Sequence, residues 1–164
     1  MPELVGQCDP GTTIEVVKEL AIRGPHRFFT GLTQIVSGRP KWQMSQDEIE
    51  ALWASVAFYN FVPRFVATGP RVRPTPAMWE AGAEPFAAVH ADLQPDAMIV
   101  CGNDLWWWLH RGRPDLDERQ AWKVRQCCIG STFAAHIMHP SANSFSSTKV
   151  RPIVEALMSA ARTA

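Results

Sequence analysis

The chain has no excess of charge of either sign. Its 164 residues include 16 basic and 16 acidic side chains, so the formal net charge is zero when histidine is neutral. This balance excludes the overall positive field that drives non-specific binding to nucleic acid, although it leaves room for a local basic patch. No apolar run approaches the roughly 20 residues that span a bilayer, and no basic-then-apolar leader is visible. We therefore expect a cytoplasmic protein with no membrane partner. We also expect a monomer rather than an oligomer.

Cysteines are few and have no metal-binding spacing. The four are Cys8, Cys101, Cys127 and Cys128, and they form neither a C-x-x-C pair nor a Cys/His pattern of the zinc-finger type. Neighbouring Cys127 and Cys128 would form only a strained bridge, and thiols are the default in a reducing compartment. We therefore expect no metal site and no cofactor.

The length suits a single domain over residues 1–164. Apolar runs predict strands at 56–62 and 97–101 and a strand or hairpin at 127–138, with a possible bend at Gly130-Ser131. Apolar periodicity and capping residues predict a helix from residue 12 or 13 to before Gly24, one that ends at 37–40, and one that opens at the capping box 45–48. Further helices are predicted from 76 toward 93, after the turn at 102–104, and at about 146–162. Strands that alternate with helices predict the α/β class, as a three-layer α/β/α sandwich around a small, mostly parallel sheet.

Three consecutive tryptophans, Trp106, Trp107 and Trp108, lie in one predicted helix. Consecutive helical positions spread these rings over about 200° of the helix surface, so they cannot all face one core. At least one ring therefore meets solvent, another layer or a ligand. Core packing with one partly exposed ring and a base-stacking platform are both compatible with the pattern.

The best site candidate is the turn His139-Pro140-Ser141, where an apolar run ends before small polar residues and the last predicted helix. Ligands of α/β proteins bind at the carboxyl ends of parallel strands, so an imidazole at such an end is well placed to act on one. The alternative is a polar residue that simply leaves the core at a strand end.

Four features follow one another along the chain in an order that is shared with a known protein family. They are a strand that ends near Asn60, the loop Arg71-Val72-Arg73-Pro74-Thr75-Pro76, the strand from Ile99 to Gly102, and the His139-Pro140-Ser141 turn. Together, over about residues 56–158, they resemble the uracil-DNA glycosylase superfamily. The resemblance implies a uracil-DNA glycosylase-like α/β/α domain whose partner is DNA. It also implies hydrolysis of the N-glycosidic bond of a flipped base, uracil or similar, in DNA repair.

The resemblance also implies roles for individual residues. His139 would donate a hydrogen bond to the base oxygen, where negative charge develops as the bond breaks. Asn60 would read the base edge, because its amide offers an acceptor and donors in one plane. Otherwise Asn60 is a strand-end asparagine that satisfies neighbouring backbone groups. Pro140 and Ser141 would also contact the substrate.

Phosphate contacts are implied for the turn and for the arginine loop. Ser141 and Ser144 would bind phosphate through hydroxyls and amides at a helix start, and Arg71 and Arg73 would add positive charge. The alternative for the serines is ordinary helix capping. A wedge that helps to flip the base is expected from Phe145 or from the loop at residues 64–74.

The first motif of the family is degraded in this chain. Gly6-Gln7-Cys8-Asp9-Pro10 resembles its Gly-Gln-Asp-Pro form with one inserted residue, so Asp9 is the candidate for positioning the attacking water. An Asp-Pro turn before the first helix explains Asp9 equally well. Residues 1–5 are too short and polar for a central buried strand, so the sheet is expected to lack its first strand. Either Met1 is not the natural start, or the chain is a shortened, catalytically inactive form that binds nucleic acid or protein.

Two further alternatives come from other classes of site. Cys101, at a strand end before Gly102, is a candidate nucleophile of a thiol hydrolase. A metal site at His136 and His139 is disfavoured, because residues three apart on a strand point to opposite faces. The iron–sulfur branch of the superfamily is excluded, because residues 61–64 and 81–84 carry no cysteine.

Overall fold

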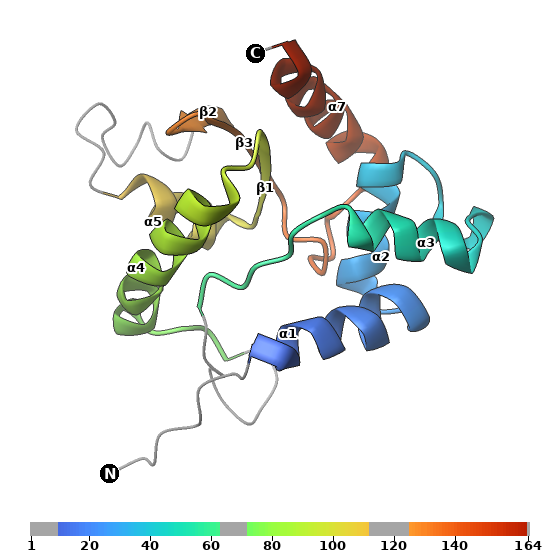
Figure 1. Ribbon diagram of the computed structural model, residues 1–164, viewed down its shortest axis with the longest axis horizontal. Helices are drawn as coiled ribbons and strands as arrows, with labels where there is room; N and C mark the ends of the chain where they lie inside the picture. Colours follow the sequence, from blue (N-terminus) through green and yellow to red (C-terminus); the bar gives the residue numbers. More distant parts are fainter. Residues whose placement is uncertain (1–9, 63–71, 112–124, 164) are drawn as a thin grey trace.

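The computed structural model describes residues 10–62, 72–111 and 125–163. They form a mixed α/β domain with a small three-stranded sheet (Figure 1). In chain order the elements are α1 (Pro10–Val16), the π-helical stretch η1 (Val17–Arg23), α2 (Arg27–Ser37), the 3₁₀ turn η2 (Lys41–Gln43), α3 (Gln46–Ala54), α4 (Pro76–Leu93), β1 (Ala97–Cys101), α5 (Asn103–His110), β2 (Gln126–Ile129), β3 (Thr132–Ile137) and α7 (Ser147–Thr163).

The sheet has the strand order β1-β3-β2 and is mixed rather than mostly parallel. Strands β1 and β3 are parallel, with Ala97 opposite Phe133, whereas β2 and β3 are antiparallel. The expected bend at Gly130-Ser131 is confirmed as the turn of the β2–β3 hairpin, and Gly130 has a φ of 60° that favours glycine. The second pair is antiparallel because this turn is too short to allow a crossover.

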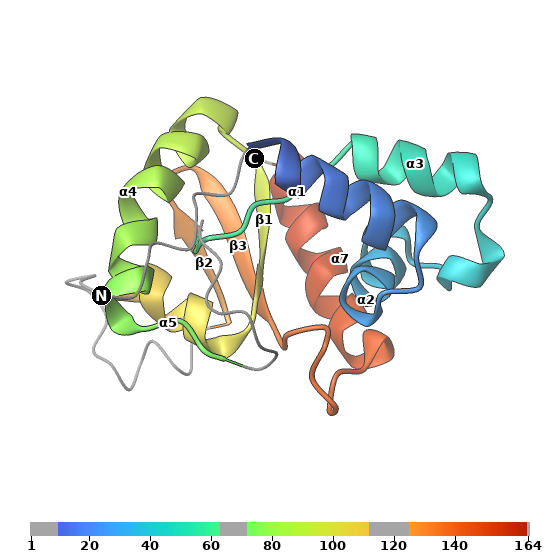
Figure 2. The same ribbon diagram turned by 90° about the horizontal axis from the view of Figure 1, so that it is seen from below.

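Helices cover both faces of the sheet. In Figures 1 and 2, α4 and α5 lie on one side, and α2, α3 and α7 lie on the other. Alternate residues of β1 point to the two sides: Ile99 packs against the core around α2 and α7, and Val100 packs beside Trp106 of α5. A strand buried on both faces has no polar alternation, so the continuous apolar run at 97–101 is explained.

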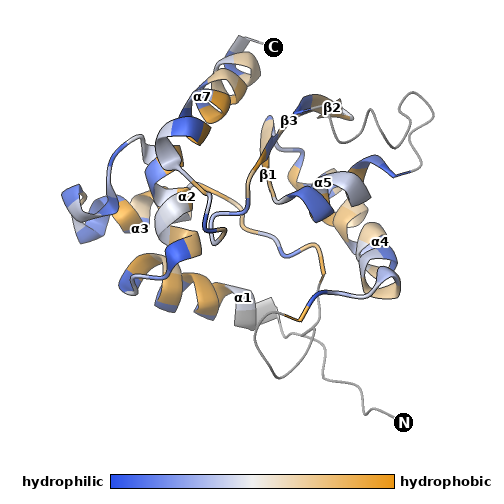
Figure 3. Cartoon of the chain, turned by 180° about the vertical axis from the view of Figure 1, so that it is seen from behind, coloured by the Kyte–Doolittle hydropathy of each residue, from blue (hydrophilic) through white to orange (hydrophobic). Residues whose placement is uncertain are grey.

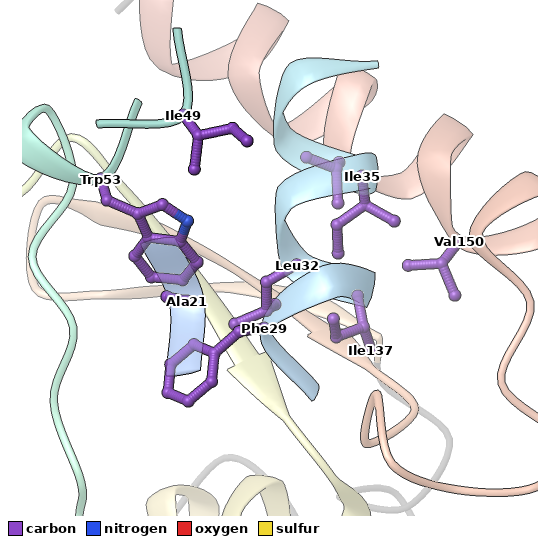
Figure 4. Close-up of a cluster of buried hydrophobic side chains, with 9 residues drawn as sticks. Ala21, Phe29, Leu32, Ile35, Ile49, Trp53, Ile137 and Val150 are labelled. Atoms are coloured by element: carbon purple, nitrogen blue, oxygen red, sulfur yellow. The ribbon is translucent and has the colours of Figure 1, made fainter. Parts of the chain in front are cut away.

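The larger core lies between the sheet, α2, α3, α7 and η1 (Figure 4). Its Trp53 indole meets the ring of Phe29 edge-on at 5.4 Å and donates a hydrogen bond to the hydroxyl of Thr33 at 3.1 Å. Thr33 in turn donates to the carbonyl of Phe29 at 2.9 Å, so this buried polar pair is satisfied. The buried members are Ala21, Phe29, Leu32, Ile35, Ile49, Trp53, Ile137, Val150 and Val154.

The predicted strand at 56–62 is wrong, and Asn60 therefore does not end a strand. The segment is an irregular stretch that leaves α3 and crosses to α4. Within the described ranges no strand lies beside it, so its backbone has no ladder to join. Its aromatic residues pack against rings of other elements instead: half-buried Phe58 meets the ring of Phe28, and buried Phe61 meets that of Phe86.

Local capping signals set several helix ends as expected. Ser45 and Glu48 form the predicted capping box of α3, and the Thr75 hydroxyl accepts the amide of Met78 at the start of α4. The first helix differs from the prediction, because its second half is π-helical. The wider π-helical turn takes Ile14 off the face that buries Ala21, and Ile14 is 56% exposed.

Hydropathy follows this layering. Strand β1 is mostly hydrophobic, whereas the start of α3 is hydrophilic (Figure 3). Among the described helices, none is both long and apolar enough to cross a membrane.

Candidate functional site

The site is built around His139, at the edge where the parallel strands β1 and β3 both end. Gly102 follows β1, and its amide donates to the carbonyl of Ile137, the last residue of β3, at 2.8 Å. Gly102 has a φ of 103°, which favours glycine. A Cβ atom at Gly102 would lie 3.6 Å from the Cβ atom of His139, so the imidazole stands directly over this turn.

The turn fixes the tautomer of His139. The backbone amide of Ser141 donates to Nδ1 of His139 at 3.2 Å, so Nδ1 carries no proton and the neutral ring presents its proton on Nε2. Loss of surrounding water lowers the pKa of His139 below its ordinary value, which favours this neutral form at pH 7. The side chain is nonetheless exposed, and its ring lies 5.0 Å from that of Phe28. His139 therefore offers a neutral N–H donor to solvent.

Helix α2 holds the turn in place. Pro140 is fully buried, and it lies with Phe145 against Gly31, where an added Cβ would meet Pro140 at 3.1 Å and Phe145 at 3.0 Å. Arg27 donates to the carbonyl of Ala142 at 2.9 Å and also to the side chain of Asn143. Sequence reasoning missed Arg27, because its partners lie more than 110 residues away. The packing of Phe145 against α2 argues against the wedge expected from that residue.

Asn60 is exposed on the irregular stretch after α3. Phe58, two residues earlier, lies 5.9 Å from Phe28, whose ring contacts His139. Among the described residues, the Asn60 amide makes no hydrogen bond.

Among the residues expected to contact phosphate, Arg73 lies near the carboxyl end of β1. Arg73 is exposed and pairs at 3.2 Å with Asp104, which lies two residues after Gly102 in the first turn of α5. Ser144 donates to the sulfur of Met138 at 3.0 Å and is not the cap of α7. Arg71 and Asp9 lie outside the described residues.

The alternatives at Cys101 and at the His136–His139 pair do not hold. Burial raises the pKa of the Cys101 thiol to about 12, which leaves almost no thiolate at pH 7. His136 is buried, with its ring 5.6 Å from Trp106, whereas His139 faces Phe28 on the other side. No cluster of three metal-ligating side chains occurs in the part of the chain that the structure describes.

The tryptophans divide between core and interhelical packing. Trp106 is fully buried, and Trp108 stacks on Trp79 of α4, with the ring planes 9° apart. The guanidinium of Arg111 lies 4.6 Å from the Trp108 ring. These contacts favour core packing over a base-stacking platform.

No family model matches the chain, and the searches of curated proteins and of solved structures found no match either.

Proposed function

We propose that this chain is a uracil-DNA glycosylase-like protein that binds a flipped base, uracil or a similar one, with His139 as hydrogen-bond donor. The observation that carries the proposal is the Ser141 amide on Nδ1, which leaves Nε2–H as the outward donor at the ends of two parallel strands. The proposal includes a three-layer α/β/α sandwich of the glycosylase type, with helices on both faces of the sheet.

The chemistry requires a donor of this kind. When an N-glycosidic bond breaks, the departing base takes up negative charge on its ring and carbonyl oxygens. A fixed N–H aimed at one oxygen stabilises that charge more than it stabilises the uncharged substrate. The donor needs no protonation step, because the Nε2–H tautomer is already neutral at pH 7. Loss of one such donor costs about 10²–10³ in rate in enzymes with comparable donors.

Two exposed polar side chains support a nucleic-acid ligand. Asn60 has a side-chain amide with no hydrogen bond to the described residues, which suits a reader of the base edge. Arg73, 83% exposed at its side chain, stands at the start of α5 and is available to a phosphate once it leaves Asp104. An exposed pair of this kind is weak, at about 0–1 kcal/mol, so a phosphate can compete with Asp104.

A second candidate is a binding module that retains the His139-Pro140-Ser141 turn but does not catalyse base release. It is favoured by the surroundings of His139, since none of the carboxylates in the described ranges is hydrogen-bonded to its ring. Hydrolysis also needs a group that positions water, and Asp9 remains the candidate for that role.

Base release from uracil-containing DNA, single-stranded and duplex, tests the proposal. The wild type is expected to release uracil, and His139→Ala to release it at least a hundredfold more slowly. His26→Ala is the matched control, because His26 is exposed at the start of α2 with no side-chain cap. Release that is unaffected by His139→Ala contradicts the proposal. DNA binding without release supports the binding module, and the absence of both rejects both candidates.

A further inference from the structure

A second pair of reactive groups lies on the other face of the sheet, away from His139. Nε2 of His110, at the end of α5, is 3.1 Å from the sulfur of Cys127 on β2. Cys127 is opposite Ala134 on β3, and both pack with Trp106 under α5. The thiol is only partly buried, whereas His110 is 2% exposed.

The hydrogen bonds of His110 fix its tautomer, and they leave an unprotonated nitrogen next to the thiol of Cys127. Nδ1 of His110 lies 2.7 Å from the carbonyl oxygen of Trp106, which can only accept, so Nδ1 carries the proton. In the neutral ring Nε2 is then an acceptor aimed at the thiol of Cys127. This is the arrangement in which an imidazole takes the proton of a cysteine and a third group orients the imidazole.

Two neighbouring groups bear on the charges that this pair would carry. The Trp106 ring is 4.1 Å from that of His110 and offers a π-face to an imidazolium. Arg125, two residues before Cys127 in the chain, donates to Nδ1 of His136 at 2.8 Å, and a positive charge near a thiol favours its thiolate. Burial, together with Arg125 and His110, lowers the pKa of His136 to about 4, so His136 adds no competing charge at pH 7.

We propose that Cys127 and His110 form an oxidisable thiol–imidazole pair that reacts with hydroperoxides. The sulfur of Cys127 attacks one peroxide oxygen as Nε2 of His110 takes the thiol proton. The O–O bond breaks, and the leaving oxygen takes the proton from the imidazolium as water or an alcohol. The sulfur is oxidised by two electrons to a sulfenic acid, and the peroxide is reduced by two.

The neighbouring thiols provide internal controls. Cys128, next in the chain, is exposed on the opposite face of β2, where it is paired with Phe133. Cys101 is partly buried, and loss of surrounding water raises the pKa of its thiol to about 12, so it is expected to react slowly while the protein is folded. One sample therefore compares Cys127 with the exposed thiol of Cys128, and a rise in labelling at Cys101 reports a disturbed fold.

The test treats the full chain with hydrogen peroxide at pH 7 and a cyclic 1,3-dione that traps sulfenic acids, followed by peptide mass spectrometry. Cys127 is expected to be labelled at least tenfold faster than Cys128. His110→Asn keeps an amide donor for the Trp106 carbonyl but removes the base. It is expected to slow Cys127 at least tenfold and to leave Cys128 unchanged.

Equal labelling of Cys127 and Cys128 in the wild type overturns the proposal, as does an unchanged Cys127 rate in His110→Asn with Cys101 still protected. If labelling of Cys101 rises in His110→Asn, the fold is disturbed and the His110→Gln variant is tested in its place. Its side-chain amide lies near the position of Nε2 and is not basic. A Cys128→Ser variant that still labels at Cys127 supports the assignment, whereas loss of that label contradicts it.

Discussion

At the scale of single residues, two side chains at the same sheet edge have opposite chemistry. Cys101 ends β1 and is partly buried, and loss of surrounding water keeps its thiol protonated, whereas His139 follows β3 and is exposed with a fixed tautomer. Their positions in the sequence are similar, because each follows an apolar strand. They differ because His139 is exposed to water and accepts a hydrogen bond from the Ser141 amide. Neither feature can be predicted from the composition of the sequence.

The buried imidazole of His136 makes stability depend on pH. Its pKa is about 4 in the folded chain, against 6.5 for an ordinary histidine, so the unfolded chain binds the proton more readily. The free energy of unfolding is therefore expected to be highest above pH 6.5 and to fall by about 3 kcal/mol as the pH drops from 6.5 to 4. Urea unfolding at pH 7, 6, 5 and 4 measures this loss.

His136→Gln provides the control for that pH dependence. The variant has no group that titrates between pH 5 and 7 at this position, so its unfolding free energy is expected to change less over the range. His139, whose pKa is also lowered, contributes with the same sign in both proteins. A wild type and variant with the same pH profile would show that His136 does not cause the loss.

At the scale of elements, α4 packs closely against the irregular stretch that follows α3. A Cβ at Gly82 would lie 2.3 Å from the carbonyl oxygen of Phe61, which is backbone and cannot move independently. Glycine to alanine inside a helix ordinarily gains about 1 kcal/mol. Here Gly82→Ala is expected to lose about 1–3 kcal/mol of unfolding free energy instead, measured by urea unfolding.

Gly31→Ala is the comparison for this prediction. At Gly31 the nearest atoms, 3.0–3.1 Å from an added Cβ, belong to the side chains of Phe145 and Pro140, and the Phe145 ring can shift. The loss is expected to be smaller than at Gly82. A stabilised Gly82→Ala protein would mean that α4 does not pack against Phe61 in this way.

Elements with local signals could be predicted, and those that depend on a distant partner could not. The capping box of Ser45, the Thr75 cap and the hairpin turn at Gly130 are encoded within a few residues. The run at 56–62 has strand composition but no neighbouring strand among the described residues, so the same residues pack as aromatic anchors. β-propensity indicates a surface that can be buried rather than a strand as such.

At the scale of the whole molecule, the candidate site depends on contacts between distant parts of the chain. The sequence predicted His139 at a strand end and linked it to the strand that ends at Gly102, and the structure adds Phe28 beside the imidazole and Arg27 on the turn. Phe28 and Arg27 come from α2, and no spacing rule connects them to His139. The pair of Cys127 and His110 was likewise not predicted, because a thiol and an imidazole 17 residues apart have no recognisable motif.

Arg27 provides a test of how α2 positions the turn. Arg27→Ala removes the hydrogen bonds to Ala142 and Asn143, so the turn is expected to loosen and base release to fall several-fold. The side chain is exposed, so the unfolding free energy is expected to change by less than about 1 kcal/mol. Arg23→Ala, which breaks an exposed pair with Glu19, is the matched control and should leave release unchanged. A release rate that is the same in both variants would exclude this positioning role.

The most direct test of the central claim is the protonation state of His139 with and without ligand. Two-bond ¹H–¹⁵N NMR spectra at pH 7, with His139→Gln to assign the signal, report which ring nitrogen carries the proton. The expected result is a neutral ring protonated on Nε2, whose signal shifts when a uracil-containing single-stranded oligonucleotide is added. A ring protonated on Nδ1, an imidazolium, or a signal that the oligonucleotide leaves unchanged would contradict the role of His139 as donor to the base.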